Sequence, residues 1–209
     1  MIVLALDTCL NTCSVAVTDG ARVLASACEA MARGHQERLA PMAREVMAEA
    51  GLEFTALERI GVTVGPGSFT GLRVGVAFAK GLASALGVPA VGVGTLEALA
   101  ADVPGLVFAC LDARRGQLYG QAFEGGHALT APDALGAETA AARLAEIAVG
   151  RTVTLVGSGA PLLAAMVPGA RIVPAEGADA VVVARLAAAR TPAPLTPLYL
   201  RAPDAKLPA

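Results

Sequence analysis

Two aspartates are the residues of this chain best placed to hold a metal-bound nucleotide. Asp7 follows the strand-length apolar run Ile2–Leu6, and Asp112 follows a second such run, Leu106–Leu111. A carboxylate at a strand end, just before a turn, is well placed to coordinate Mg²⁺ through water. The alternative is that each carboxylate accepts hydrogen bonds from backbone amides of its own tight turn. The residue types leave both interpretations open for Asp7.

For Asp112, the residues that follow favour the turn role. A hairpin that holds a phosphate needs glycines, because backbone N–H groups must approach the ligand closely. The sequence DARRGQ has Ala113, Arg114 and Arg115 at those places. The segment Val156–Ala160 does consist of small residues, which could face an adenine ring. We therefore expect a cleft that is only partly equipped for a nucleotide.

The stretch VGPGSFTGLRVG has the glycines of a phosphate-binding loop that leads into a helix. A P-loop also needs a lysine that reaches the phosphates, and this stretch has none, which excludes that motif. Gly65-Pro66-Gly67 predicts a tight turn, and Ser68 or Thr70 can cap the helix. The candidate nucleotide-binding residues, for a site that a subunit junction completes, are Asp7, Gly65, Gly67, Ser68, Asp112, Arg114 and Gly157.

The histidines do not fit a catalytic or metal-binding pattern. A serine or cysteine triad needs a histidine base, and the chain has two histidines, His35 and His127. A helical metal pair needs a second histidine four residues after His35, where Leu39 stands. We expect both histidines to be structural or solvent-facing, and we predict no catalytic residue and no metal ligand.

A ridge of very small side chains runs along the helix predicted over Thr70–Leu86. A glycine inside a helix costs about 1 kcal/mol relative to alanine, so a closely packed neighbour should offset that cost. The pattern leaves open whether this neighbour is the chain's own sheet or another molecule. The helix predicted over His35–Ala50 also has one apolar face. The candidate partner-interface residues are Leu39, Met42, Val46, Gly71, Leu72, Gly75, Val76, Ala79 and Ala83.

The order of predicted strands and helices occurs twice along the chain. A fixed offset of 105 residues also superposes Asp7 on Asp112 and Gly20 on Gly125. Such self-similarity indicates a duplicated unit. We predict an α/β protein with two similar lobes, residues 1–101 and 102–209, each with a mixed sheet flanked by helices.

The charge balance argues against direct binding of nucleic acid. With 16 basic and 18 acidic residues the net charge is −2, whereas binding to phosphates is driven by a basic excess. The four cysteines form no CxxC pair, which predicts reduced, buried thiols in a cytoplasmic protein. No signal peptide or membrane span is expected. The proline-rich tail from Thr191 should be extended, with Leu198–Leu200 packed back onto the body.

Six segments, in order and from end to end, resemble the bacterial TsaB family. They are LALDTCLNTCSVAV, GHQERLAP, VGPGSFTGLRVGVAFAKGLA, GVGTLEALA, LDARRGQLYGQAF and PLYLRAPDAKLPA. GPGSFTGLR followed by LDARRGQ is the specific part of this resemblance. The family is the dimerisation subunit of the complex that makes N6-threonylcarbamoyladenosine in tRNA.

The resemblance implies an actin-like ATPase (ASKHA) fold and a non-catalytic role. It implies pairing with the catalytic subunit TsaD, which binds metal and transfers threonylcarbamoyl from threonylcarbamoyl-AMP to the tRNA adenosine beside the anticodon. In the family, pairing uses the first two helices, here about His35–Ala50 and Thr70–Leu86. The resemblance also implies a small ATPase subunit, TsaE, tRNA contact mainly through partners, and a homodimer when the chain is alone.

A different class of function stays open at this stage. An independent actin-like ATPase or small-molecule kinase could use Asp7 and Asp112 as its metal-binding pair. In the scaffold interpretation the chain has no cofactor of its own, and ATP or ADP with Mg²⁺ is relevant only within the complex. Turnover of Mg-ATP by the purified chain distinguishes the two.

Overall fold

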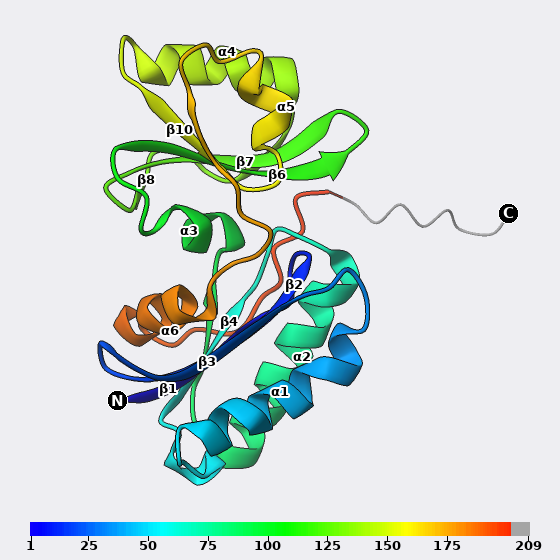
Figure 1. The fold of residues 1–209 in the computed structure, drawn as a ribbon, viewed down its shortest axis with the longest axis vertical. Helices are drawn as coiled ribbons and strands as arrows, with labels where there is room; N and C mark the ends of the chain where they lie inside the picture. Colours follow the sequence, from blue (N-terminus) through cyan, green and yellow to red (C-terminus); the bar gives the residue numbers. More distant parts are fainter. Residues whose placement is uncertain (202–209) are drawn as a thin grey trace, which may run out of the picture.

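The computed structural model describes residues 1–201 and has two stacked lobes, each built on one sheet (Figure 1). The first sheet has five strands in the order β3-β2-β1-β4-β5. β1 is antiparallel to β2 and parallel to β4. The strands are β1 (Ile2–Asp7), β2 (Thr12–Asp19), β3 (Arg22–Ala30), β4 (Arg59–Thr63) and β5 (Ala90–Val93).

The second sheet repeats this order as β8-β7-β6-β10-β11, with β9 added beside β7. The duplication predicted from the 105-residue offset is confirmed. Gly20 and Gly125 occupy the equivalent hairpin turns with φ of 56° and 55°, a conformation that glycine adopts without strain. The strands are β6 (Leu106–Arg114), β7 (Gln117–Glu124), β8 (His127–Ala128), β9 (Asp133–Gly136), β10 (Val153–Val156) and β11 (Arg171–Val173).

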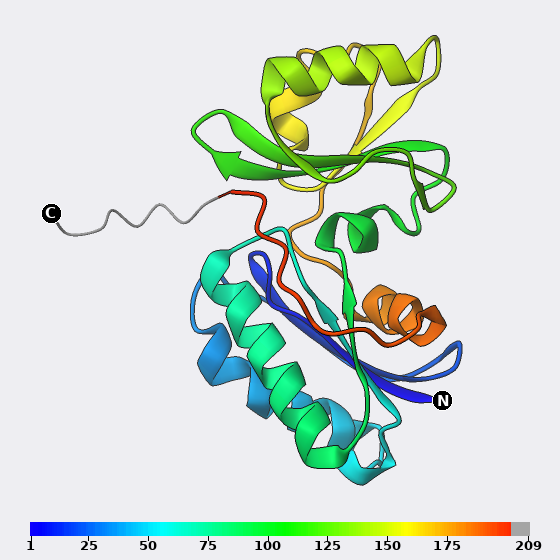
Figure 2. The same ribbon diagram turned by 180° about the vertical axis from the view of Figure 1, so that it is seen from behind.

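Helices cover both faces of the first sheet. α1 (His35–Glu49) and α2 (Phe69–Leu86) lie on one face and α6 (Ala180–Ala189) on the other (Figure 2). The side chains of β1 divide accordingly: Leu4 and Leu6 belong to the core beneath α1 and α2, and Val3 and Ala5 to the core beneath α6. This alternation follows from the two-residue period of a strand. A single turn, η1 (Phe54–Ala56), precedes β4.

The second sheet is covered in the same way. α4 (Ala137–Ala148) and α5 (Ala160–Ala164) lie on its outer face, and α3 (Thr95–Ala100) lies between the lobes (Figure 1). Even-numbered apolar residues of β6 face α4 and α5, and odd-numbered ones face α3. None of the helices within residues 1–201 is long and apolar enough to cross a membrane.

The predicted division at residue 101 is wrong for two elements. α6 comes late in the chain but packs on β1, β2 and β4 of the first sheet. The contact is close, because a Cβ added at Gly61 would lie 2.8 Å from the Cβ of Ala187. α3, expected in the first lobe, packs on β6 and β7. The chain therefore crosses from the first lobe to the second before α3 and returns before α6.

Candidate functional site between the lobes

A cavity of about 700 Å³ opens between the lobes. Its walls come from the β1–β2 loop, the loop before α2, the β6–β7 hairpin and the end of the described chain. Four of the seven predicted nucleotide-binding residues line it: Gly67, Ser68, Asp112 and Arg114. Both tyrosines of the chain, Tyr119 and Tyr199, and also Phe69, line the same cavity. These three aromatic residues have no common spacing along the chain, so no sequence pattern placed them in the site.

The remaining three predicted residues lie elsewhere. Gly157 packs on the second lobe's own backbone, where a Cβ would approach the carbonyl oxygen of Cys110 to 2.4 Å. Gly65 lines a different cavity. Asp7 is completely buried and is not among the lining residues of either cavity. The predicted nucleotide-binding set is therefore brought together only in part.

The Asp7 carboxylate joins three segments of the first lobe. Its Oδ1 accepts hydrogen bonds from Thr63 Oγ1 at 2.5 Å and from the Cys9 amide at 3.1 Å. Its Oδ2 accepts one from the Ala178 amide at 3.2 Å, in the segment that returns from the second lobe to α6. Burial raises the pKa of Asp7, and these hydrogen bonds oppose the rise. The geometry assigns Asp7 a structural role in tying β1, β4 and the crossover together.

Asp112 has the turn role that its neighbours predicted. Its Oδ1 accepts a 2.7 Å hydrogen bond from the Arg114 amide, and its own amide donates to Ser158 Oγ. Arg114 and Arg115 have φ of 64° and 56°, in the left-handed region where non-glycine residues are uncommon. The carboxylate is exposed and stabilises this unusual hairpin.

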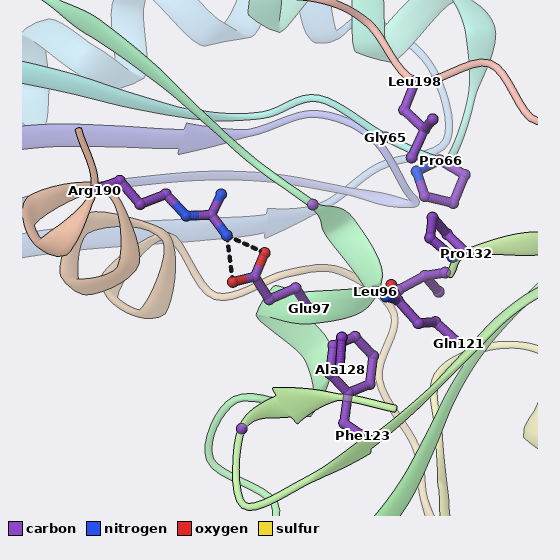
Figure 3. A pocket seen from close by; sticks show the side chains of 12 residues that line it. Gly65, Pro66, Leu96, Glu97, Gln121, Phe123, Ala128, Pro132, Arg190 and Leu198 are labelled. Carbon is purple, nitrogen blue, oxygen red and sulfur yellow. Dashed lines mark hydrogen bonds and ion pairs between the residues drawn. The ribbon is translucent and has the colours of Figure 1, made fainter. Parts of the chain in front are cut away.

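A second cavity of about 320 Å³ is lined by residues of both lobes and by Leu198 of the C-terminal segment (Figure 3). One wall is an ion pair between Glu97 of α3 and Arg190, which also donates to the Gly92 carbonyl at 2.7 Å. The opposite wall comes from the second lobe and includes Gln121, Phe123, Ala128 and Pro132. Pro66 and Leu198 line both cavities, so the two cavities are neighbours.

The predicted partner-interface residues are wrong as a contact surface. The side-chain positions of all nine lie inside this chain's own core, where the non-glycine members are at most 8% exposed. The small-residue ridge of α2 faces the end of β1. A Cβ at Gly71 would lie 2.0 Å from the Thr8 carbonyl oxygen, and one at Gly75 would lie 2.5 Å from Thr8 Oγ1. Of the two neighbours left open for the ridge, the chain's own sheet is correct.

The exposed side of α2 carries the charged residues Arg73 and Lys80 along one edge, and beside them runs a row of residues without charged side chains. We call Val74, Ala77, Phe78, Gly81, Leu82 and Ala85 the outer stripe; its residues are half-buried or exposed. A Cβ added at Gly81 would meet no atom of residues 1–201 within 4 Å. At the start of α2 the Arg73 guanidinium lies 3.7 Å from the centroid of the Phe69 ring, and its Nε donates to the Tyr199 hydroxyl.

The two histidines have the structural or solvent-facing places that the sequence predicts, whereas the prediction of buried thiols is wrong for Cys28. His35 is buried, and its Nε2 lies 3.2 Å from the Thr12 carbonyl oxygen, which is a structural role. His127 is exposed in β8. The four cysteines are free, and all except Cys28 are buried. Within residues 1–201 no three His, Cys, Asp or Glu side chains converge into a metal-binding group.

The duplicated sheets, with an interlobe cleft between the matching aspartate turns, define the class of protein to which this chain belongs. This is a two-lobed protein with the actin-like ATPase fold, a fold that it shares with solved dehydratase-activator and hexokinase structures. The model of the family described as TsaD, tRNA N6-adenosine threonylcarbamoyltransferase, matches residues 27–161. The chain belongs to that family, and within it to the TsaB-type proteins.

Three relatives illustrate this membership. A Mycobacterium tuberculosis protein described as uncharacterized is 37% identical over 84% of this chain and 79% of its own length. The Escherichia coli tRNA threonylcarbamoyladenosine biosynthesis protein TsaB is 36% identical, but the match spans 57% of this chain and 53% of that protein. A Pseudomonas aeruginosa crystal structure, described as similar to the peptidase YeaZ, aligns over 96% of this chain and 99% of its own, with a TM-score of 0.80 and 28% identity.

Proposed function

We propose that this chain is the non-catalytic dimerisation subunit of a tRNA threonylcarbamoyladenosine-forming complex and pairs with a TsaD-type catalytic subunit. The TsaB relatives support the role in this tRNA modification. A tRNA N6-adenosine threonylcarbamoyltransferase from Moorella thermoacetica is itself 38% identical over 42% of this chain. A similarity of this kind supports pairing of two related subunits through equivalent surfaces.

The outer stripe of α2 is the single observation that carries the pairing. Gly81 costs the helix about 1 kcal/mol relative to alanine, and no neighbour in the described chain lies where a side chain would offset it. The large residues of the stripe, such as Phe78, remain half-buried rather than covered. A second helix seated on this stripe would use the bare surface for close approach and would cover the apolar residues.

The groups that could do chemistry have structural roles, which supports a non-catalytic subunit. Asp7 is buried and accepts three hydrogen bonds, and Asp112 stabilises its own hairpin. The arginines of that hairpin stand where a phosphate-binding turn would place glycines. The proposal therefore assigns the metal, the nucleotide and the transfer of the threonylcarbamoyl group to the partner subunits.

The proposal extends to the other components of the assembly. A TsaE-type small ATPase joins the complex, and tRNA is held mainly by the partners, in line with the net charge of −2. ATP or ADP with Mg²⁺ meets this chain only where a subunit junction completes a site around Gly67–Thr70 and Arg114. In the absence of the partner, the outer stripe is covered by a second copy, giving a homodimer.

Size-exclusion chromatography of the chain with its TsaD-type partner tests the pairing. Ala77→Glu and Gly81→Leu place a charge or bulk on the outer stripe and should weaken complex formation at least tenfold without unfolding the chain. Ala145→Glu puts the same charge on an exposed alanine of α4 in the other lobe and is the matched control. Unchanged assembly of both stripe variants would disprove pairing through this surface.

A further inference from the structure

The described C-terminal segment runs from the first lobe to the second across the space between them. We call Leu195–Arg201 the strap. It follows α6, passes the loop before α2 and ends beside the β6–β7 hairpin, as the red segment in Figures 1 and 2 shows. It contains no helix or strand, so its position depends on the contacts that follow.

The strap begins with two anchors on the first lobe. Leu195 is 7% exposed and belongs to the core beneath α1 and α2. The Leu198 amide donates a 2.7 Å hydrogen bond to the carbonyl of Val64, just beyond the end of β4. Gly65 makes room for this contact, because a Cβ there would lie 2.8 Å from the Leu198 carbonyl oxygen.

The middle of the strap is held by the start of α2. The Tyr199 ring lies 5.4 Å from the Phe69 ring, centroid to centroid. Its hydroxyl accepts a 3.2 Å hydrogen bond from Arg73 Nε, and the same guanidinium stacks on Phe69. Aromatic pairs and cation–π contacts of this kind each contribute modestly, so together they form a latch that can open.

The end of the strap reaches the second lobe. Arg201 Nη1 donates a 3.3 Å hydrogen bond to the Ala113 carbonyl, in the hairpin whose Arg114 and Arg115 have left-handed backbones. The strap thus contacts both lobes. Leu198 also lines both interlobe cavities, so the strap lies at the place where the two cavities meet.

We propose that the strap is an intramolecular clamp that fixes the position of the two lobes relative to each other. Two-lobed proteins move by hinges, and a ligand that touches both lobes selects the closed arrangement. Here the chain's own C-terminal segment occupies that position. Because it is tethered through α6, its effective concentration at the cleft is high and needs no external ligand. With the two lobes held in one arrangement, α1 and α2 keep a fixed orientation relative to the second lobe.

A distance measurement between the lobes tests the clamp directly. Spin labels at Glu49→Cys in α1 and Ala145→Cys in α4 report the lobe separation by pulsed electron paramagnetic resonance. The background carries Cys28→Ser, because Cys28 is the exposed thiol. Dilution with unlabelled protein removes distances between molecules. The clamped chain should give one narrow distance distribution.

Combining Tyr199→Ala with Arg201→Ala removes the latch and the contact with the second lobe. We expect the distance distribution to widen at least twofold. Amide exchange in Asp112–Gly116 should become about tenfold faster, whereas exchange in α1 stays unchanged. Tyr199→Phe keeps the ring stacking and should have a smaller effect. Thr196→Ala is the matched control, since Thr196 is exposed and its hydroxyl donates to the carbonyl of Pro194, the residue just before the strap.

These measurements can contradict the proposal that the strap is a clamp, and such a result would leave the proposed function unaffected. An unchanged distance distribution in the double variant, with its far-ultraviolet circular dichroism spectrum intact, would show that the lobes are held without the strap. A widened distribution in Thr196→Ala as well would show that any change in the tail has this effect, and the assigned contacts would then be wrong. Pairing through α2 is measured separately and does not enter either result.

Discussion

Asp7 and Asp112 hold equivalent positions in the two lobes, and each accepts a hydrogen bond from the backbone amide two residues further on. The distances are 3.1 Å to the Cys9 amide and 2.7 Å to the Arg114 amide. The local motif is therefore conserved between the two halves of one chain. The surroundings differ: Asp7 is fully buried among polar partners, whereas Asp112 is exposed at the cleft. This difference predicts different consequences for the same substitution.

Asp7→Ala should lower the free energy of unfolding by about 3 to 5 kcal/mol, because three buried donors lose their acceptor. Asp112→Ala should cost about 1 kcal/mol or less, since its site is open to water. Urea unfolding of the two variants measures this difference. Equal losses would mean that the buried hydrogen bonds of Asp7 do not contribute as the geometry indicates.

The raised pKa of Asp7 gives stability a defined pH dependence. Because burial raises this pKa in the folded state, the folded chain binds the proton more tightly than the unfolded chain. The stabilising contribution is full below the unfolded value near 3.8 and is lost as pH rises through the folded pKa. Unfolding free energies of the parent and Asp7→Asn should therefore differ by an amount that changes with pH in this window. A constant difference between the two proteins would contradict the shift.

We predict that the change from glycine to alanine has opposite effects on stability at two positions of α2. Gly71→Ala should destabilise the chain by more than about 2 kcal/mol, because the new Cβ would meet the Thr8 carbonyl oxygen at 2.0 Å and the backbone cannot yield easily. Gly81→Ala should stabilise it by about 0.5 to 1 kcal/mol, since the new methyl group meets open space and alanine favours helix. Thermal or urea unfolding of the pair measures both signs.

Mg-ATP turnover by the purified chain distinguishes the scaffold from the independent ATPase or kinase. We expect no turnover above that of a buffer blank, because the Asp7 carboxylate is buried and does not line the cleft. Turnover that disappears in Asp112→Asn, a variant expected to fold normally, would favour the enzyme and contradict the proposed role.

The thiols should differ sharply in reactivity. Burial raises the pKa of Cys9 and Cys110 to about 12 and that of Cys13 to about 11, so little thiolate is present at pH 8. A disulfide reagent should titrate one thiol, Cys28, in the folded chain and all four after unfolding. Rapid reaction of more than one thiol in the folded chain would contradict this burial.

Much of this architecture could be predicted from local patterns. Strand length, helical spacing and turn residues are decided within about ten residues, so the helices predicted over His35–Ala50 and Thr70–Leu86 agree with α1 and α2 to within one residue. Of the two caps that the sequence left open, Ser68 and Thr70, the structure has Ser68. The duplication was also visible, because Asp7 with Asp112 and Gly20 with Gly125 meet the same turn requirements twice. The turn role of Asp112 followed from the arginines after it.

What lies against each patterned surface was decided by the tertiary structure. Periodicity shows that the ridge of Gly71 and Gly75 must be buried, but a neighbour such as Thr8 is chosen by contacts between distant segments. For the same reason the sequence did not place α6 on the first sheet or bring Tyr199 against Arg73. Spacing along the chain reports which face is covered, and only the folded chain determines what covers it.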